Sequence, residues 1–343
     1  MDAILLQILN GLDKGAAYAL IALGLTLIFG TLGVVNFAHG ALFAIGAFCA
    51  VTMKNLLSLE KVTLSETEKT AWGTPVEIRS SYTELWFGPE MGAWMSDWAV
   101  PLSILLTIPV MLFVGWAIER GLIKHFYKRP HADQILVTFG LAIVLQEIIK
   151  IFFGANNISM GAPEALRGTV DIGIWLGFAE NAIVYNLWRL VYFLFAALII
   201  GGVFAFLQFT TFGMVVRAGM ADRETVGLLG IDIDKKFTFT FAIAAVVAGL
   251  AGAMYTAVTP PIYDMGMELL VLSFVVVVVG GMGSLPGAVL AGFLLGILES
   301  LSAHEVVKQY LGSLDQIIVY LVAIIVLLVL PRGLMGRKGV MEE

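Results

Sequence analysis

The chain has 343 residues, of which 59% are hydrophobic and 13% are charged, with a mean hydropathy of +0.93 and a formal net charge of −6. Soluble domains average about 45–50% apolar and about 25% charged residues, so this composition excludes a soluble globular protein. The apolar runs are long and continuous, which favours membrane-spanning helices over the short alternating strands of a porin-like barrel. At about 20 residues per span, the chain has room for roughly eight to ten helices.

Nine apolar segments are predicted to span the membrane, which makes the expected fold an all-α, polytopic membrane protein. They cover residues 15–33, 41–53, 100–118, 134–153, 190–209, 237–257, 269–279, 288–301 and 314–330. The first apolar run already starts at Ile4, but the polar pairs at 10–11 and 13–14 interrupt it, so its spanning part is expected to begin near Gly15. The single cysteine, Cys49, excludes an internal disulfide and is interpreted as a small buried hydrophobe.

Residues 1–343 are predicted to form one transmembrane domain whose orientation follows from its basic residues. Lys and Arg concentrate in short stretches at residues 119–133, 213–236 and 331–343. Because the cytoplasmic loops of membrane proteins carry an excess of these residues, this side is predicted to be cytoplasmic, with the C-terminus there and the N-terminus outside. The polar insert at 54–98 and the polar loop at 154–188 then face the periplasm. The insert carries Trp72, Trp86, Trp94 and Trp98, which suit a small cap at the membrane interface. An acid stands near the start where a secretory signal has basic residues, so the spans themselves are expected to target the chain.

The stretch at 213–236, GMVVRAGMADRETVGLLGIDIDKK, is too polar to lie in the membrane. At 3.6 residues per turn it predicts one short amphipathic helix with a narrow stripe of mostly small residues, while Arg217 and Glu224 lie on another face. The stripe consists of Met214, Ala218, Ala221, Thr225 and Leu228. Gly227 and Gly230 supply the signals that end the helix. Two interpretations stay open from the pattern alone: a surface that a partner grips, or an ordinary connecting helix.

Two apolar segments are interrupted in the same way. Each has a Gly-x-x-Gly start, at Gly30 and Gly280, then a short break, then a Gly-Ala pair that opens a new helix at Gly40 and Gly287. Breaks inside membrane segments persist only where protein or water satisfies the freed backbone groups. Corresponding breaks in two halves of a chain point to an internal pseudo-repeat and to a transport pathway, although close packing through small residues explains glycine equally well. The pathway candidates are Asn36, His39, Gly40, Gly280, Gly281, Gly283, Ser284 and Gly287.

Four polar side chains lie within the first break or near the end of an apolar segment: Asn36, His39, Glu147 and Lys150. His39 and Asn36 are functional candidates by depth, but if the break lies at the membrane surface they cap a turn, and capping is the favoured interpretation for His39. Glu147 and Lys150 are spaced i,i+3 near the end of a span, which favours a local ion pair over a proton relay.

Several kinds of chemistry leave no trace in the sequence. The chain has no Gly-x-x-x-x-Gly-Lys-Ser/Thr loop for ATP phosphates. Its four histidines are scattered, so no metal site and no cofactor are expected. No span carries a ladder of acids or arginines, which argues against a proton pump or a voltage sensor. No gathered catalytic group supports an enzyme, and no nucleic-acid partner is expected.

Four blocks, taken together and in order, carry a resemblance to a known family. They are YALIALGLTLIFGTLGVVNFAHGALFAIGAF (18–48), RAGMADRETVGLLGIDIDKKFTFTFAIAAVVAGLAGAMY (217–255), GGMGSLPGAVLAGFLLGILE (280–299) and LPRGLMGRKG (330–339). The chain resembles the LivH-type permease subunits of bacterial ABC importers for branched-chain amino acids, a group with relatives that serve urea and short amides. The insert at 54–98 departs from the pattern, because it is longer than the family leads us to expect.

The resemblance implies a multi-pass protein of the bacterial inner membrane that forms half of a translocation pathway. The implied partners are a LivM-type second permease, two cytoplasmic ATPases of the LivG and LivF type, and a periplasmic substrate-binding protein. ATP hydrolysis is then expected in the partners and not in this chain. In the family, the helix that docks on an ATPase matches Arg217, Ala218, Asp222, Glu224, Gly230 and Ile231, and Gly227 lies within the same stretch.

The alternative is a stand-alone channel or an ion-coupled secondary transporter for a small solute. That class predicts an ion-binding carboxylate within a span or a charge-lined filter, and the sequence shows neither clearly. The sequence leaves the substrate open among branched-chain amino acids, other amino acids, urea and amides.

Overall fold

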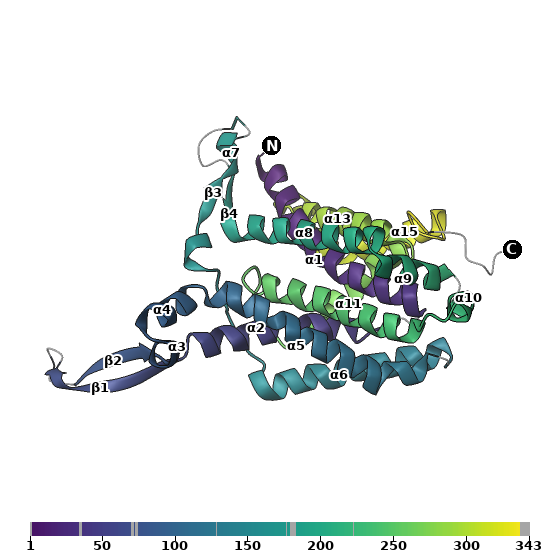
Figure 1. Ribbon diagram of the computed structural model, residues 1–343. Helices are drawn as coiled ribbons and strands as arrows, with labels where there is room; N and C mark the ends of the chain where they lie inside the picture. The colour runs from purple at the N-terminus through teal and green to yellow at the C-terminus, as the bar shows by residue number, and fades with distance from the viewer. Residues whose placement is uncertain are drawn as a thin grey trace.

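The computed structural model is a bundle of long helices that run roughly along one common direction, with a β-hairpin projecting from one end (Figure 1). The structure describes residues 2–33, 36–69, 72, 75–127, 129–175, 177–178, 183–221 and 223–336.

Nine helices form the bundle within the described residues. They are α1 (Asp2–Leu32), α2 (His39–Leu57), α5 (Ala99–Gly121), α6 (His131–Phe153), α8 (Leu187–Phe209), α11 (Ile233–Tyr255), α12 (Met265–Gly280), α13 (Leu285–Ser302) and α15 (Leu314–Val329). Seven of them are long and apolar enough to cross a membrane, while α12 and α15 are apolar but have only 16 residues each. At 1.5 Å per residue these two are about 24 Å long. The all-α, polytopic membrane fold predicted from the sequence is therefore confirmed.

The end of the bundle that carries the hairpin is called the hairpin end below. Here the insert folds into antiparallel strands β1 (Glu60–Lys69) and β2 (Pro75–Ser81), followed by the short helices α3 (Tyr82–Phe87) and α4 (Pro89–Asp97). The second polar loop contains η2 (Glu164–Leu166), α7 (Ile172–Trp175) and a small sheet of β3 (Thr169–Asp171) with β4 (Val184–Asn186). The helix α14 (Glu305–Tyr310) lies in the connection between α13 and α15. Neither small sheet was predicted.

The opposite end of the bundle is called the break end. Both glycine breaks lie here, between α1 and α2 and between α12 and α13. The same end holds η1 (Ile123–Phe126), α9 (Thr211–Ala221) and α10 (Arg223–Leu228). The two helix pairs joined by breaks pack on each other, α1 against α12 and α13, and α2 against α12. Whether the pairs are an internal repeat stays a prediction.

Among the seven long spans, α1 and α11 are the most deeply buried, whereas α6 and α8 are the least. Small residues let the central helices approach closely. A Cβ atom on Gly252 of α11 would lie 2.0 Å from the carbonyl oxygen of Phe43 on α2, and one on Gly296 of α13 would lie 2.4 Å from the amide nitrogen of Gly15 on α1. In a membrane, where lipid is as apolar as leucine, such backbone contact is a main source of helix association.

Two predicted boundaries were wrong. The helix α1 is continuous from Asp2, so the polar pairs at 10–11 and 13–14 do not interrupt it, because their side chains find partners on other elements. The amphipathic helix predicted within 213–236 corresponds to α9 and α10, and residue 222, which separates these two labels, lies outside the described residues. Gly227 lies inside α10 and does not end it.

Replacement of Gly252 by valine tests the contact between α2 and α11. The added side chain has no room against the Phe43 carbonyl, so Gly252→Val is expected to destabilise the protein in detergent by about 1–3 kcal/mol, the usual cost of overpacking. The measurement is a thermal unfolding curve of the purified protein. Gly202→Val is the control, because Gly202 on α8 is exposed and a Cβ there would meet nothing within 4 Å. Equal melting temperatures for the two variants would contradict the close approach.

Candidate functional site

Three segments that are far apart in the sequence meet at the break end. A Cβ atom on Gly30, near the end of α1, would lie 2.5 Å from Cε of Met220 on α9 and 3.8 Å from Cα of Gly283 in the second break. On its other side, α9 packs on α11, because a Cβ on Gly219 would lie 2.6 Å from Cδ1 of Ile233. The surface helix predicted from the sequence therefore contacts the end of α1 at a point that also lies close to the second break.

The first break begins at Gly33, whose φ of +65° is a left-handed conformation that suits glycine. Residues 34 and 35 lie outside the described part of the chain. Asn36 is fully buried, and its side-chain oxygen accepts a hydrogen bond of 3.0 Å from the backbone N–H of Ala38. The helix α2 then starts at His39, one residue before the Gly-Ala pair that was predicted to open it. Asn36 thus holds the turn that reverses the chain into α2.

His39 does not cap this turn, so the favoured prediction for its side chain was wrong. The residue is completely buried, and neither ring nitrogen has a hydrogen-bond partner among the described residues. The ring fits only because α1 has a glycine opposite it: a Cβ on Gly24 would lie 2.4 Å from Nε2 of His39 and 3.3 Å from the carbonyl oxygen of Ala244. An unsatisfied polar ring deep among α1, α2 and α11 is costly, which keeps His39 a candidate for the pathway.

The second break uses two left-handed glycines, Gly281 with φ of +104° and Gly283 with φ of +83°. Ser284 is the N-cap of α13, and its hydroxyl accepts a hydrogen bond of 3.2 Å from the N–H of Gly287. The helix therefore begins at Leu285, two residues earlier than predicted. Gly280 and Gly287 face each other across the break, since a Cβ on Gly287 would lie 2.1 Å from the carbonyl oxygen of Gly280. Both glycines are needed for this close turn.

The C-terminal segment at residues 330–336 closes the second break, which sequence reasoning missed. The N–H of Leu334 donates to the carbonyl of Val279 at 2.8 Å, and that of Met335 donates to the carbonyl of Gly280 at 3.0 Å. These carbonyls belong to the last turn of α12, where carbonyl groups have no donor within their own helix. The residues of the C-terminal segment belong to the fourth block that carries the family resemblance, LPRGLMGRKG, and that block is the sequence signal for this segment.

The face of α9 and α10 that points away from the bundle is called the docking face below. It consists mostly of exposed small and apolar residues and includes one arginine. Its described members with exposed side chains are Met214, Arg217, Ala218, Thr225, Leu228 and Leu229. Leu228 is 88% exposed and Leu229 is 73% exposed, which is unusual for leucines at a membrane protein's polar end. The opposite face, with Val216 and Val226, is buried.

Most of the predicted coupling residues lie on or beside this face. Arg217 and Ala218 are exposed on α9, and Gly230, with φ of +78°, ends the segment as predicted. Ile231 is half-buried and leads into α11. Asp222 and the side chain of Glu224 lie outside the described residues. Asp232 caps α11, where hydrogen bonds from Lys235 hold the pKa of its carboxyl below the usual range.

Near the hairpin end, charged residues of α1 pair with other elements inside the bundle. Nζ of Lys14 lies 2.6 Å from Oε1 of Glu299 on α13, and the hydroxyl of Tyr18 donates to Oε2 of the same carboxylate at 2.6 Å. These contacts join the first helix to α13, close to the glycine contact of Gly15 with Gly296. From the sequence, Asp13 and Lys14 predict an interruption of the apolar run. The pairing of Lys14 with Glu299 has no local sequence signal, because the two residues are 285 positions apart.

A second group of polar residues joins α1 to α8 and β4. Asp13 accepts a hydrogen bond from the hydroxyl of Tyr185 and lies 3.6 Å from Nη1 of Arg189, which also donates to Asn10 at 2.8 Å. Burial raises the pKa of Tyr185, so its hydroxyl stays protonated and donates. Every charged side chain of this group therefore has a partner. The predicted pair of Glu147 with Lys150 is also present, with 3.6 Å between Oε2 and Nζ.

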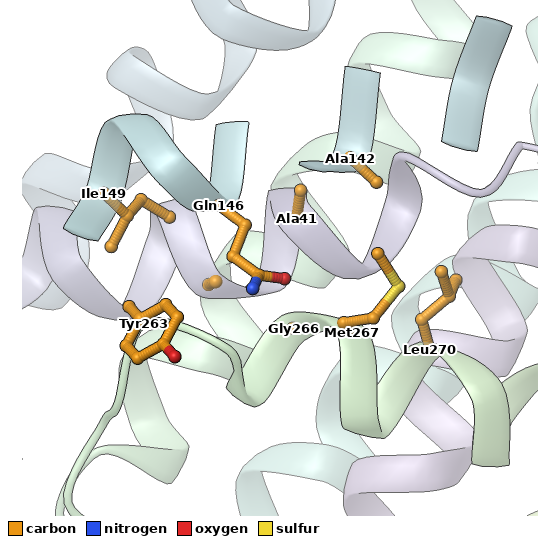
Figure 2. Close-up of a pocket in the computed structure, with 9 residues that line it drawn as sticks. Ala41, Ala142, Gln146, Ile149, Tyr263, Gly266, Met267 and Leu270 are labelled. Atoms are coloured by element: carbon orange, nitrogen blue, oxygen red, sulfur yellow. The ribbon is translucent and has the colours of Figure 1, made fainter. Parts of the chain in front are cut away.

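Figure 2 shows the amide of Gln146 on α6 pointing into a space bordered by Ala41, Tyr263 and Met267. The space has a volume of about 10 Å³, which is about the size of one water-sized probe. The space lies between α2, α6 and α12. Beside it, α2 and α12 come into close contact at Gly40 and Gly266. An amino acid does not fit in this cavity. Among the described residues, no group of three or more His, Cys, Asp or Glu is placed to hold a metal ion.

Seven long apolar helices and two breaks that meet beneath a surface helix define a multi-pass membrane protein of the transporter class. The chain belongs to the family described as the permease component of branched-chain amino acid transport systems, whose sequence pattern matches residues 7–330. This confirms the resemblance given by the four sequence blocks.

Individual relatives agree with the family. The chain is 27% identical to the high-affinity branched-chain amino acid transport system permease protein LivH of Salmonella typhimurium, and 29% identical to BraD of Pseudomonas aeruginosa, a permease protein of the same description. Each match covers 97% of this chain and 96% of the relative. The ribose import permease protein RbsC of Haemophilus influenzae is 24% identical over 66% of this chain and 69% of its own length. No solved structure matches the chain.

Replacement of Gly333 by alanine tests the closure of the second break. Gly333 has φ of +77°, and a Cβ there would lie 2.6 Å from the amide nitrogen of Gly281, so Gly333→Ala is expected to strain the segment by about 1–3 kcal/mol. Amides 334 and 335 should then exchange with deuterium faster, as followed by mass spectrometry. Gly312→Ala is the control, since a Cβ there meets nothing within 4 Å. Unchanged exchange in Gly333→Ala would show that these hydrogen bonds do not hold the segment.

Removal of the Glu299 carboxylate tests the pairing of α1 with α13. Glu299→Ala leaves Lys14 and Tyr18 without their shared acceptor, which is expected to cost about 1–3 kcal/mol of stability. The control is Glu147→Ala, because both members of that pair are about half exposed and such pairs contribute about 0–1 kcal/mol. Thermal unfolding in detergent measures both. A larger loss in Glu147→Ala than in Glu299→Ala would contradict the assignment.

Proposed function

We propose that this chain forms one half of the translocation pathway of an ABC importer that lies in the bacterial inner membrane. The second half is a LivM-type permease, two cytoplasmic ATPases of the LivG and LivF type supply the energy, and a periplasmic binding protein delivers the substrate. Family membership supports the permease role, and the names of the relatives support branched-chain amino acids, or a related small solute, as substrate.

The observation that carries the energy coupling is the position of the docking face. Its outer side presents Arg217, Ala218 and Leu228 to the solvent, while Met220 on its inner side contacts Gly30 of the first break and lies near Gly283 of the second. An ATPase that grips the outer side and moves it would therefore displace both breaks together. Interrupted helices at the interface of two helix pairs are where transporters change access.

In this proposal the break end faces the cytoplasm and the hairpin end faces the periplasm. The basic residues support this orientation, because Arg217, Lys235, Lys236 and Arg332 all belong to segments at the break end. With nine spans the N-terminus then lies outside and the C-terminus inside. The insert at 54–98 and the loop at 154–188 become the periplasmic parts.

The small volume beside Gln146 supports a shared pathway. A space of about 10 Å³ holds no amino acid, so a route for one needs a wall from a second permease or a more open state of this chain. The least buried long helices, α6 and α8, leave apolar surface available for such a neighbour or for lipid. The missing wall of the pathway and the exposed apolar surface both agree with a chain that forms half of a transporter.

Charge reversal and steric block on the docking face test the proposal. The full importer is reconstituted in proteoliposomes with the two ATPases, the second permease and the binding protein, and ATP-dependent uptake of leucine is measured. Arg217→Glu and Ala218→Trp are expected to lower uptake by about tenfold or more, equivalent to about 1.4 kcal/mol, and to reduce co-purification of the ATPases. The second permease should still co-purify.

Arg129→Glu serves as the matched control, because Arg129 is an exposed arginine at the break end that lies outside the docking face. Uptake in this variant is expected to stay near the wild-type value. Unchanged uptake in both docking-face variants would contradict the coupling. Uptake by this chain alone, without the other subunits, would instead favour a stand-alone channel or an ion-coupled carrier.

A further inference from the structure

The short helix α4 carries an exposed apolar stripe that the transport function does not use. Met91, Trp94 and Trp98 follow each other at spacings of three and four residues, so they lie on one face of the helix. Met91 is 52% exposed, Trp94 is 48% exposed and Trp98 is 52% exposed. The two indole rings stack with 6.2 Å between their centroids. This arrangement buries little apolar surface within the chain.

The neighbouring helix α3 extends the stripe on one side. Phe87, the last residue of α3, is 59% exposed and lines an open groove together with Met91 and Trp94. The inner side of α4 is packed instead, because a Cβ on Gly92 would lie 2.3 Å from Cα of Glu84. The pair α3–α4 therefore has one packed side and one apolar outer side.

Trp98 joins the stripe of α4 to the spanning helix α5, and its backbone angles, φ −95° and ψ 15°, end one helix before the next begins. Hydrogen bonds from Trp98 N–H to Trp94 and from Leu102 N–H to Trp98 carry the helical turn across the junction. Within α5 an exposed apolar side continues from this junction, since Leu105 is 59% exposed and Leu112, seven residues later, is 36% exposed. Since α5 is long and apolar enough to cross a membrane, this exposed face of α5 is available to lipid.

Tryptophans mark the two ends of the lipid-facing part of α5. Trp98 and Trp116 are both exposed and lie 18 positions apart, which is about 27 Å along a helix. The hydrocarbon core of a bilayer is about 30 Å thick, and tryptophan is enriched at both of its boundaries. Trp98 thus lies at the level of the headgroups, and the stripe of α4 begins there.

We propose that α3–α4 is an interfacial membrane anchor that lies among the phospholipid headgroups, with Phe87, Met91 and Trp94 inserted toward the acyl chains. Zwitterionic lipids fit best, because the acidic residues Glu90 and Asp97 flank the stripe and attract the headgroup ammonium more than the phosphate. The anchor holds the base of the β1–β2 hairpin at the membrane surface while the hairpin projects away from the bundle (Figure 1).

Spin labels on α4 test the anchor directly. Cys49→Ser removes the single cysteine, and Met91→Cys or Ser96→Cys then introduces one label site on the apolar stripe or on the opposite, exposed side of the helix. The protein is placed in nanodiscs of phosphatidylethanolamine and phosphatidylcholine, and collision with oxygen and with a water-soluble nickel complex is measured. The label at 91 is expected to favour oxygen and the label at 96 to favour nickel, with position 91 about 5–10 Å below the headgroups.

Equal access of the nickel complex to both labels would overturn the proposal. So would protection at 91 that appears only when the binding protein is added, or spin–spin broadening that reveals a second copy of the chain. An independent measurement needs no label: brominated phospholipids should quench less of the total fluorescence in the Trp94→Phe/Trp98→Phe variant than in the wild type. Trp72→Phe is its control, because Trp72 is 93% exposed on the hairpin, and its loss should not lower the quenched signal.

Discussion

Direct backbone contact at glycine residues is the constraint on which the rest of the structure depends. The contacts of Gly252 with Phe43 and of Gly296 with Gly15 bring α2 against α11 and α13 against α1, which forms the buried centre of the bundle. Lipid offers no hydrophobic force to push these helices together, so close packing and internal hydrogen bonds replace it. The ion pair of Lys14 with Glu299 adds a polar contact beside the glycines at the hairpin end.

The same use of glycine has a different result at the break end. There, left-handed residues such as Gly33 and Gly281 end helices and free their last carbonyls. At the second break the C-terminal segment donates to these carbonyls. At the first break, Asn36 instead accepts from the N–H of Ala38 and so supports the start of α2. Because Met220 touches Gly30, which itself lies close to Gly283, the surface helix α9 packs near two places where the backbone is irregular. Such places can change conformation more easily than the continuous helices around them.

The nine apolar helices of the bundle, both breaks and the position of the surface helix could be predicted from the sequence, because long apolar runs and glycines have local signatures, although only seven of the nine are long enough to count as spans. It was not sufficient where an outcome depends on distant partners. The polar residues at 13–14 predict an interruption, but contacts with Glu299 and Tyr185 let them lie within a continuous helix. His39 is predicted to cap a turn, but it is buried against Gly24. The two hairpins were missed because their short strands lie in polar stretches without a clear alternating pattern. The role of the segment at 330–336 follows from hydrogen bonds to α12, which no local pattern predicts.

Coupling through the docking face is the central claim, and site-specific photocrosslinking in the intact membrane tests it most directly. A photoreactive phenylalanine analogue at Ala218, which is exposed on α9, is expressed together with the complete importer. The expected result is a covalent adduct with an ATPase subunit. The same analogue at Leu198, an exposed residue in the membrane-spanning helix α8, should give none. Adducts from Ala218 that contain only lipid or the second permease, in an importer that still transports, would contradict the assignment of α9 and α10 as the site where the ATPase binds.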